Sequence, residues 1–144
     1  MPLDKNKING TTVVVTGGAG LIGWHLVDGL LAQGFKGRGG ENVRNGKIEN
    51  IEGALKNSNC SFIEADILDQ AKMNEVCKGA DVIYHLACLG VRHSIHSPFE
   101  NHRVNAEGSL NMLEAARINK ISKFFYISTS EIYGDVAHFP INEN

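Results

Sequence analysis

Four glycines within seven positions are the residues of this chain whose spacing points most directly to chemistry. They lie between a short β-branched run and an apolar helical pattern, at Gly17, Gly18, Gly20 and Gly23. Glycine permits positive φ in a turn, and it lets the backbone approach a ligand closely because it has no Cβ. A helix beginning near Leu21 would direct its unpaired N–H groups and positive dipole end at the same gap. The spacing therefore predicts a phosphate-binding turn.

A carboxylate further along the chain favours a dinucleotide as the ligand. Glu41 follows the glycines by about 20 residues, where a residue that binds the adenosine ribose is expected. A P-loop is excluded, because Trp24 and His25 stand where that motif needs Lys and Ser or Thr. The structural alternative is a plain glycine turn in an ordinary βα unit.

The elements that must position this turn alternate regularly along the chain. Apolar runs predict strands near residues 12–16, 35–40, 61–67, 81–87 and 123–127, and helical spacing predicts helices near 21–33, 47–56, 69–77 and 98–119. Alternation of this kind implies right-handed βαβ crossovers and a parallel sheet. We therefore expect an α/β fold, a Rossmann-like doubly wound sheet with strand order 3-2-1-4-5.

Two stretches are expected to depart from a regular pattern. The second strand contains Gly37, Gly39 and Gly40, which supply little packing, so we expect it to be weak. Residues 90–97 are expected to form a loop. The long helix that follows is expected to begin at Pro98. Its buried face is expected to carry Val104, Leu110, Leu113 and Ala116.

Composition narrows the class of protein. The 144 residues are 42% hydrophobic and 21% charged with a formal net charge of −2, which predicts one domain and argues against nucleic-acid binding. No signal peptide or membrane span is recognised, so we expect a cytoplasmic protein with three free, mostly buried cysteines. The neighbouring His93, His96 and His102 are interpreted as solvated side chains and not as metal ligands.

With these residues identified, the chain resembles the N-terminal part of an extended short-chain dehydrogenase/reductase, the family of NAD-dependent nucleotide-sugar epimerases, dehydratases and decarboxylases. The resemblance rests on five blocks in the expected order: Thr16–Gly23, Glu64–Ile67, His85–Cys88, Val104–Gly108 and Ser128–Gly134. It covers essentially the whole chain from Thr12 to Gly134. It implies NAD as the cofactor and a nucleotide sugar as the substrate of the full-length enzyme.

The resemblance also implies which residues bind the cofactor. They are Gly17, Gly20, Leu21, Ile22 and Gly23 at the pyrophosphate, Glu41 at the adenosine ribose with Asn42 beside it, Asp66 and Ile67 around the adenine, Leu86, Ala87 and Cys88 under the cofactor, and Asn105 near the nicotinamide ribose. A carboxylate at position 41 favours NAD over NADP, because it repels a 2′-phosphate. Cys88 departs from the alanine that is usual in the family.

The implied chemistry is transient oxidation of the sugar C4 hydroxyl. By position, Thr129 would bind that hydroxyl, and Glu131 resembles the carboxylate that handles a sugar-ring proton. Ser130 stands where many hexose dehydratases have an Asp, and a serine is a poor general acid. The triplet resembles that of UDP-glucuronate decarboxylases and some hexose 4,6-dehydratases more than that of a simple 4-epimerase.

One family feature is missing from these residues. The family's general base is the tyrosine of a Tyr-x-x-x-Lys pair, yet none of Tyr84, Tyr126 and Tyr133 has a lysine four positions on. We therefore expect residues 1–144 to be a partial NAD-binding domain that lacks the later strands and the substrate subdomain, and to be inactive alone. The alternative is a non-catalytic NAD-binding module, regulatory or vestigial. The sugar, the reaction and the oligomeric state stay open, a homodimer included.

Overall fold

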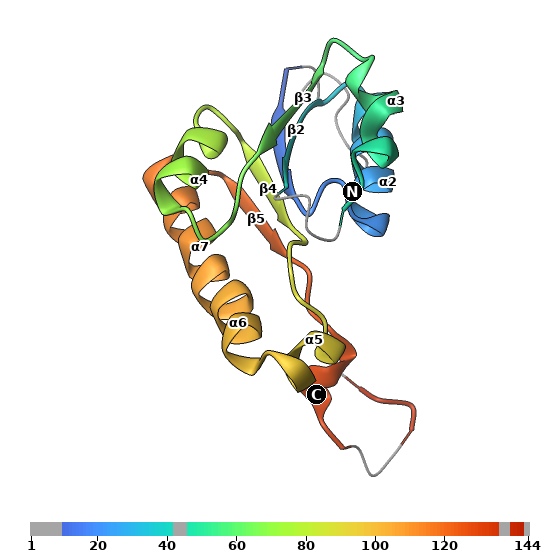
Figure 1. The fold of residues 1–144 in the computed structure, drawn as a ribbon. Coiled ribbons are helices and arrows are strands. Elements are labelled where there is room, and N and C mark those ends of the chain that lie inside the picture. The colour runs from blue at the N-terminus through green and yellow to red at the C-terminus, as the bar shows by residue number, and fades with distance from the viewer. Residues whose placement is uncertain (1–9, 42–45, 136–138, 143–144) are drawn as a thin grey trace.

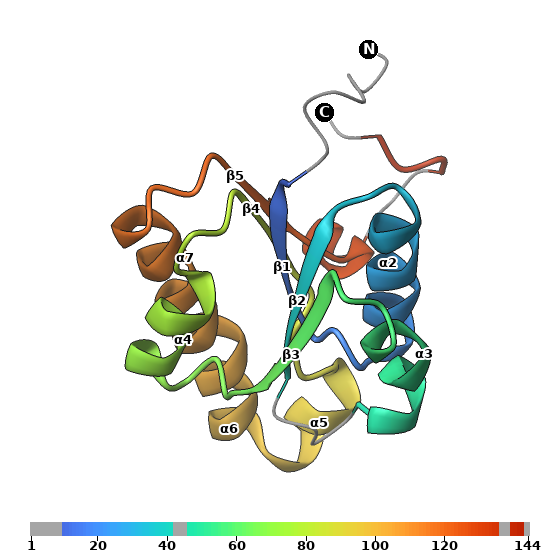
Figure 2. The same ribbon diagram turned by 90° about the horizontal axis from the view of Figure 1, so that it is seen from above.

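A computed structural model describes residues 10–41, 46–135 and 139–142 and shows one parallel sheet between two helical layers (Figures 1 and 2). All paired strands run parallel, in the order β3-β2-β1-β4-β5. The strands are β1 (Thr12–Thr16), β2 (Lys36–Glu41), β3 (Cys60–Glu64), β4 (Val82–His85) and β5 (Lys123–Tyr126). The predicted α/β class and strand order are confirmed.

The helices lie on both faces of the sheet. They are α2 (Leu21–Ala32), the 3₁₀ turn η1 (Ile48–Ile51), α3 (Glu52–Leu55), α4 (Gln70–Cys77), α5 (Val91–His96), α6 (Pro98–His102), the π-helical turn η2 (Arg103–Glu107), α7 (Gly108–Ile118) and the 3₁₀ turn η3 (Ser130–Tyr133). Figure 2 shows α2 and α3 on one face, with α4, α6 and α7 on the other. In the described part of the chain, no helix is long and apolar enough to cross a membrane.

The alternation of β1 explains why it lies at the centre of the sheet. Val14 belongs to the apolar cluster under α4 and α7, whereas Val13 and Val15 belong to the cluster under α2 and α3. All three side chains are at most 1% exposed. Successive strand residues point to opposite faces, so a run of valines fills both cores of a doubly covered sheet.

The second strand forms with full pairing despite its glycines. β2 pairs with β1 on one side and β3 on the other, at five positions each. A side chain added at Gly37 would touch Val27 and Leu31 of α2, and one added at Gly40 would touch Val76 of α4. The glycines are thus covered from both faces by helix side chains, which supply the packing that the strand itself lacks.

The region from 90 to 119 also differs from its prediction. Residues expected to form a loop contain the helix α5, and the expected long helix is divided by η2. Val104 and Ala116 are buried as predicted, but Leu110 is 65% exposed and Leu113 is 50% exposed. Besides Ala116, the buried residues of α7 are ones that the spacing of the leucines did not predict: Gly108, Met112 and Ala115.

Two helix ends carry residue types that are typical of those positions. The side chain of Asp69 accepts a hydrogen bond from the backbone N–H of Lys72, 2.9 Å away, and so caps α4. Gly34, with φ of 89°, follows the last turn of α2. Asp69 lies where the chain passes from β3 to α4, and Gly34 lies where it passes from α2 to β2.

Candidate functional site

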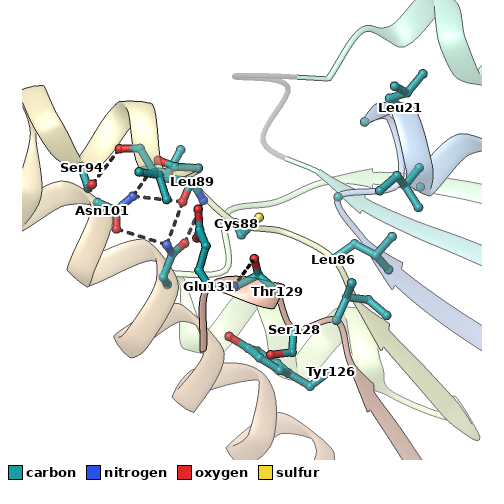
Figure 3. A pocket seen from close by; sticks show the side chains of 18 of the residues that line it. Leu21, Leu86, Cys88, Leu89, Ser94, Asn101, Tyr126, Ser128, Thr129 and Glu131 are labelled. Carbon is teal, nitrogen blue, oxygen red and sulfur yellow. Dashed lines mark hydrogen bonds between the residues drawn. The ribbon is translucent and has the colours of Figure 1, made fainter. Parts of the chain in front are cut away.

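A cleft of about 770 Å³ opens where the carboxyl ends of β1, β4 and β5 meet (Figure 3). This is the edge at which open α/β sheets bind ligands. We define the cleft by the residues that line it: Gly17, Gly20–Gly23, Leu86, Cys88–Val91, Ser94, Asn101, Asn105, Tyr126–Thr129, Glu131 and Ile132.

The glycine turn forms one wall of the cleft. Gly17 has φ of 70°, a conformation that side chains rarely adopt, and its N–H donates to the carbonyl of Gly40, 3.1 Å away. A Cβ at Gly17 would lie 3.0 Å from the backbone nitrogen of Ala87. The turn therefore touches the ends of both β2 and β4, and this close approach depends on glycine.

The N-terminus of α2 faces the same cleft. A Cβ at Gly23 would collide with the carbonyl oxygen of Gly17, so the first turn of the helix packs directly on the glycine turn. Gly20 is the N-cap, and no side chain in the described residues caps the helix. The first amides of α2 are therefore available to an anion. Leu21 and Ile22 line the cleft and are 75% and 68% exposed.

The segment after β4 forms the floor of the cleft, which we define as residues 86–89. The Thr16 hydroxyl accepts hydrogen bonds from the N–H groups of Leu86 and Ala87, at 3.2 Å each. Of the three residues assigned to this segment, Leu86 and Cys88 line the cleft, whereas Ala87 is not among the lining residues. The end of β1 thus fixes the start of the floor.

Asn105 holds the other end of the floor. Its Oδ1 accepts from the N–H of Leu89 and its Nδ2 donates to the carbonyl of Leu89, both at 2.8 Å. Asn101 donates to the carbonyls of Leu89 and Gly90. Asn105 lines the cleft, and much of its amide is engaged by Leu89. Asn101 was missed by the sequence analysis, although two amides four residues apart on a helix are a usable signal.

His85 was also missed as a site residue. Its side chain is 2% exposed at the end of β4, and it lies between the hydroxyls of Thr16 and Ser109. Burial lowers the pKa of His85 to about 4, so the imidazole is neutral near pH 7. A histidine in an apolar strand gives no local sign of such partners.

The opposite wall comes from the end of β5 and η3. Thr129 and Glu131 both line the cleft, and the Thr129 hydroxyl accepts from the N–H of Glu131 at 3.3 Å. Both side chains are exposed. Ser130 opens η3 and is not among the lining residues. Two of the three residues expected to be catalytic are therefore brought to the same cleft as the glycine turn (Figure 3).

Asp66 and Ile67, which are expected around the adenine, are not among the residues that line the cleft. Asp66 lines a second hollow of about 430 Å³ at the end of β3. Ile67 is buried against Gly108 at the start of α7. The backbone of Glu41 ends β2, while its side chain and all of Asn42 lie outside the described residues.

The cysteines only partly follow the expectation of buried thiols. Cys77 is buried, Cys60 is half-buried and Cys88 is exposed in the cleft. All three are free. The expectation is therefore wrong for Cys88, which comes shortly after β4 and lines the cleft.

The parallel sheet, the glycine turn and the cleft at the carboxyl ends define a Rossmann-type domain. The family model described as GDP-mannose 4,6 dehydratase matches residues 14–144. The chain therefore belongs to this family of extended short-chain dehydrogenases/reductases, which includes nucleotide-sugar epimerases, dehydratases and decarboxylases.

Individual relatives are similar over most of this chain. It is 38% identical over 135 residues to UDP-glucuronic acid decarboxylase 2 of Arabidopsis thaliana. The aligned region covers 93% of this chain and 29% of that protein. A UDP-N-acetylglucosamine 4-epimerase from Methanobrevibacter ruminantium, solved with UDP-N-acetylmuramic acid, superimposes with a TM-score of 0.86 at 34% identity. That match covers 94% of this chain and 43% of the epimerase.

A third similar protein was solved with a dinucleotide. The UDP-glucose 4-epimerase from Brucella ovis, in complex with NAD, superimposes with a TM-score of 0.84 at 29% identity, over 92% of this chain and 40% of the epimerase. In each of these comparisons the chain spans less than half the length of its relative.

Proposed function

We propose that this chain is the NAD-binding part of a nucleotide-sugar-modifying enzyme. The observation that carries the proposal is the uncapped N-terminus of α2 on the glycine turn, opening into a cleft that also holds Thr129 and Glu131. A pyrophosphate at the helix N-terminus would accept from its free amides. The geometry leaves the rest of the cleft, toward β5, for the nicotinamide end and the sugar.

The relatives support this assignment. The Brucella ovis epimerase was solved with NAD, and the Methanobrevibacter ruminantium epimerase was solved with a UDP-sugar. When bound, NAD would supply the acceptor for a hydride from the sugar. This chain's own residues would orient the reactants: Thr129 would bind the reacting hydroxyl, and Glu131 would handle a proton on the sugar ring.

The reaction class favoured here is decarboxylation or dehydration over simple 4-epimerisation. The triplet Thr129, Ser130 and Glu131 supports this preference, as does the similarity to a UDP-glucuronic acid decarboxylase. No tyrosine in these 144 residues has a lysine four positions on. We therefore infer that residues outside this sequence supply the base, and that residues 1–144 alone bind the dinucleotide without turning over substrate.

The test is a calorimetric titration of the chain with NAD⁺ and, separately, with NADP⁺. We expect saturable binding with NAD⁺ preferred by about tenfold or more, because a carboxylate at the ribose repels a 2′-phosphate. Glu41→Gln should remove most of that preference. Glu52→Gln, at an exposed position on α3, is the matched control and should leave the preference intact.

The titration also bears on the alternative of a non-catalytic module. Binding of neither dinucleotide would refute both versions of the proposal. If NAD⁺ binds, the next measurement is turnover of a UDP-sugar by the longest protein that carries this sequence. A loss of kcat in Thr129→Val without a loss of NAD⁺ affinity would support the enzyme, and unchanged turnover would contradict the role of Thr129.

A further inference from the structure

A buried histidine lies directly beneath the floor of the cleft. His85 contacts three other elements: the hydroxyl of Thr16 at the end of β1, the hydroxyl of Ser109 on α7, and the rings of Phe124 and Tyr126 on β5. The ring centroids lie 5.9 and 5.7 Å from that of His85. None of these four neighbours carries a charge near pH 7, so hydrogen bonds and burial set the state of the imidazole.

Thr16 determines the role of one imidazole nitrogen. Its Oγ1 accepts from the N–H groups of Leu86 and Ala87, at 3.2 Å each. A hydroxyl oxygen has two acceptor sites and one proton. The Ala87 amide takes one acceptor site, and the Leu86 amide takes the other while also donating to the backbone carbonyl of Thr16, 3.2 Å away. The proton is then left for Nδ1 of His85, which lies 2.7 Å away. Nδ1 must therefore accept, which leaves the ring proton on Nε2.

Ser109 gives the same answer from the other side of the ring. Its hydroxyl donates to the carbonyl of Asn105 at 2.6 Å, so its oxygen is free to accept. Nε2 of His85 lies 3.0 Å from that oxygen and donates to it. The two ends of the chain of hydrogen bonds thus require the same neutral tautomer. A charged imidazole would direct a second donor at Thr16, whose acceptor sites are already filled.

We propose that neutral His85, with its proton on Nε2, is a positioning residue for the floor of the cleft. Through Thr16 it connects to the glycine turn and to the amides of Leu86 and Ala87. Through Ser109 it connects to Asn105, which holds Leu89. The consequence for a ligand rests on the proposed function, because these are the segments that would hold NAD.

The test combines nitrogen NMR of the histidine ring with a substitution at the far end of the chain of bonds. In the wild-type protein, the His85 signals, assigned by their loss in His85→Gln, should show a single tautomer that does not titrate between pH 7.5 and pH 5. Ser109→Ala should leave the Nε2 proton without its acceptor and so shift the Nε2 signal, shift the amide signals of Leu86 and Leu89, and weaken NAD⁺ binding by about tenfold. Ser109→Thr, which keeps a hydroxyl, should retain all three properties.

Ser122→Ala is the matched control. The Ser122 hydroxyl also donates to a backbone carbonyl, that of Asp81 at 2.7 Å, but at the opposite edge of the sheet. Ser122→Ala should leave the His85 tautomer, the amide signals of Leu86 and Leu89, and the NAD⁺ affinity unchanged. If Ser109→Ala does not fold, Ser109→Cys keeps the volume with a much weaker acceptor.

Either of two results would overturn the proposal. One is a wild-type His85 that titrates near pH 6.5 or populates both tautomers. The other is a Ser109→Ala variant whose Leu86 and Leu89 amide signals do not shift, as is expected for the Ser122→Ala control. Both are read without a dinucleotide, so a protein that does not bind NAD⁺ would refute the proposed function and still decide the role of His85.

Discussion

At the scale of single residues, the glycine turn is held by close backbone contacts. The backbone of Gly17 approaches Ala87, and the first turn of α2 reaches Gly17 through Gly23. The same helix contains Gly29, which is exposed and would meet nothing within 4 Å if it carried a Cβ. In the same helix, packing therefore requires glycine at position 23 but not at position 29.

Gly23→Ala should destabilise the protein by about 2 kcal/mol, because the methyl group must displace the backbone of the turn. It should also abolish NAD⁺ binding in the titration described above. Gly29→Ala should instead raise the free energy of unfolding by about 0.5 to 1 kcal/mol, since alanine favours the helix and restricts the unfolded chain. Urea unfolding of both variants checks this, and equal effects would contradict the packing argument.

His85 makes stability depend on pH. Its folded pKa of about 4 lies below the ordinary value of 6.5, because burial penalises the charged ring. Between these values the unfolded chain binds more protons than the folded one, so the free energy of unfolding rises with pH. The contribution is complete above about pH 6.5, and about 3 kcal/mol is lost as the pH falls toward 4.

The measurement is the free energy of unfolding of wild type and His85→Asn at pH 7.5, 5.5 and 4.5. The difference between the two proteins should shrink as the pH falls. His25→Asn, at an exposed position on α2, should follow the wild type at every pH. If the difference in free energy of unfolding between wild type and His85→Asn is constant over this range, the pKa of His85 is not lowered by folding.

At the scale of elements, β2 shows how a strand of poor propensity is stabilised by its neighbours. It lies between two strands and two helical layers, so its glycines need supply no packing of their own. The side chain of Arg38 on β2 donates from Nη1 to the carbonyls of Val76 at 2.6 Å and Lys78 at 2.9 Å. These carbonyls end α4, where a cation is favoured.

Arg38→Met should therefore lower the free energy of unfolding by about 2 kcal/mol, because two hydrogen bonds to a charged group are lost. Amide hydrogen exchange should quicken in the last turn of α4 before it quickens elsewhere. Lys36→Met is the control, since Lys36 is an exposed residue of the same strand. Equal losses in the two variants would mean that Arg38 does not hold α4 to the sheet.

At the scale of the whole molecule, the described sheet has an open edge. β5 pairs with β4 on one side, and within the described residues no strand pairs with its other side. Phe125, Tyr126 and Ile127 are 42%, 56% and 50% exposed there. Unpaired N–H and C=O groups beside apolar side chains form a template for association.

Prepared as these 144 residues alone, the protein should associate as its concentration rises. Sedimentation velocity over a hundredfold dilution should show the change in mass. Ile127→Lys should reduce association, because a charge beside an edge strand opposes pairing. Leu55→Lys, which places the same charge on α3 away from this edge, should not. A monomer at all concentrations would contradict the expectation.

The sequence by itself determined the fold class, the strand order, the glycine turn and the cap of α4. These features depend on short-range patterns: β-branched runs, glycine spacing and one capping aspartate. The family resemblance assigned Thr129 and Glu131, which follow the fifth strand, and the carboxyl ends of parallel strands share one edge of the sheet with the glycine turn.

Only the tertiary structure decided what depends on residues far apart in the chain. His85 bonds Thr16 and Ser109, which lie 69 and 24 positions away. The pairing of β2 on both sides and the exposure of Leu110 likewise follow from neighbours in space. A local pattern records the preferences of a segment, whereas burial and hydrogen-bond partners are set by what the rest of the fold brings against it.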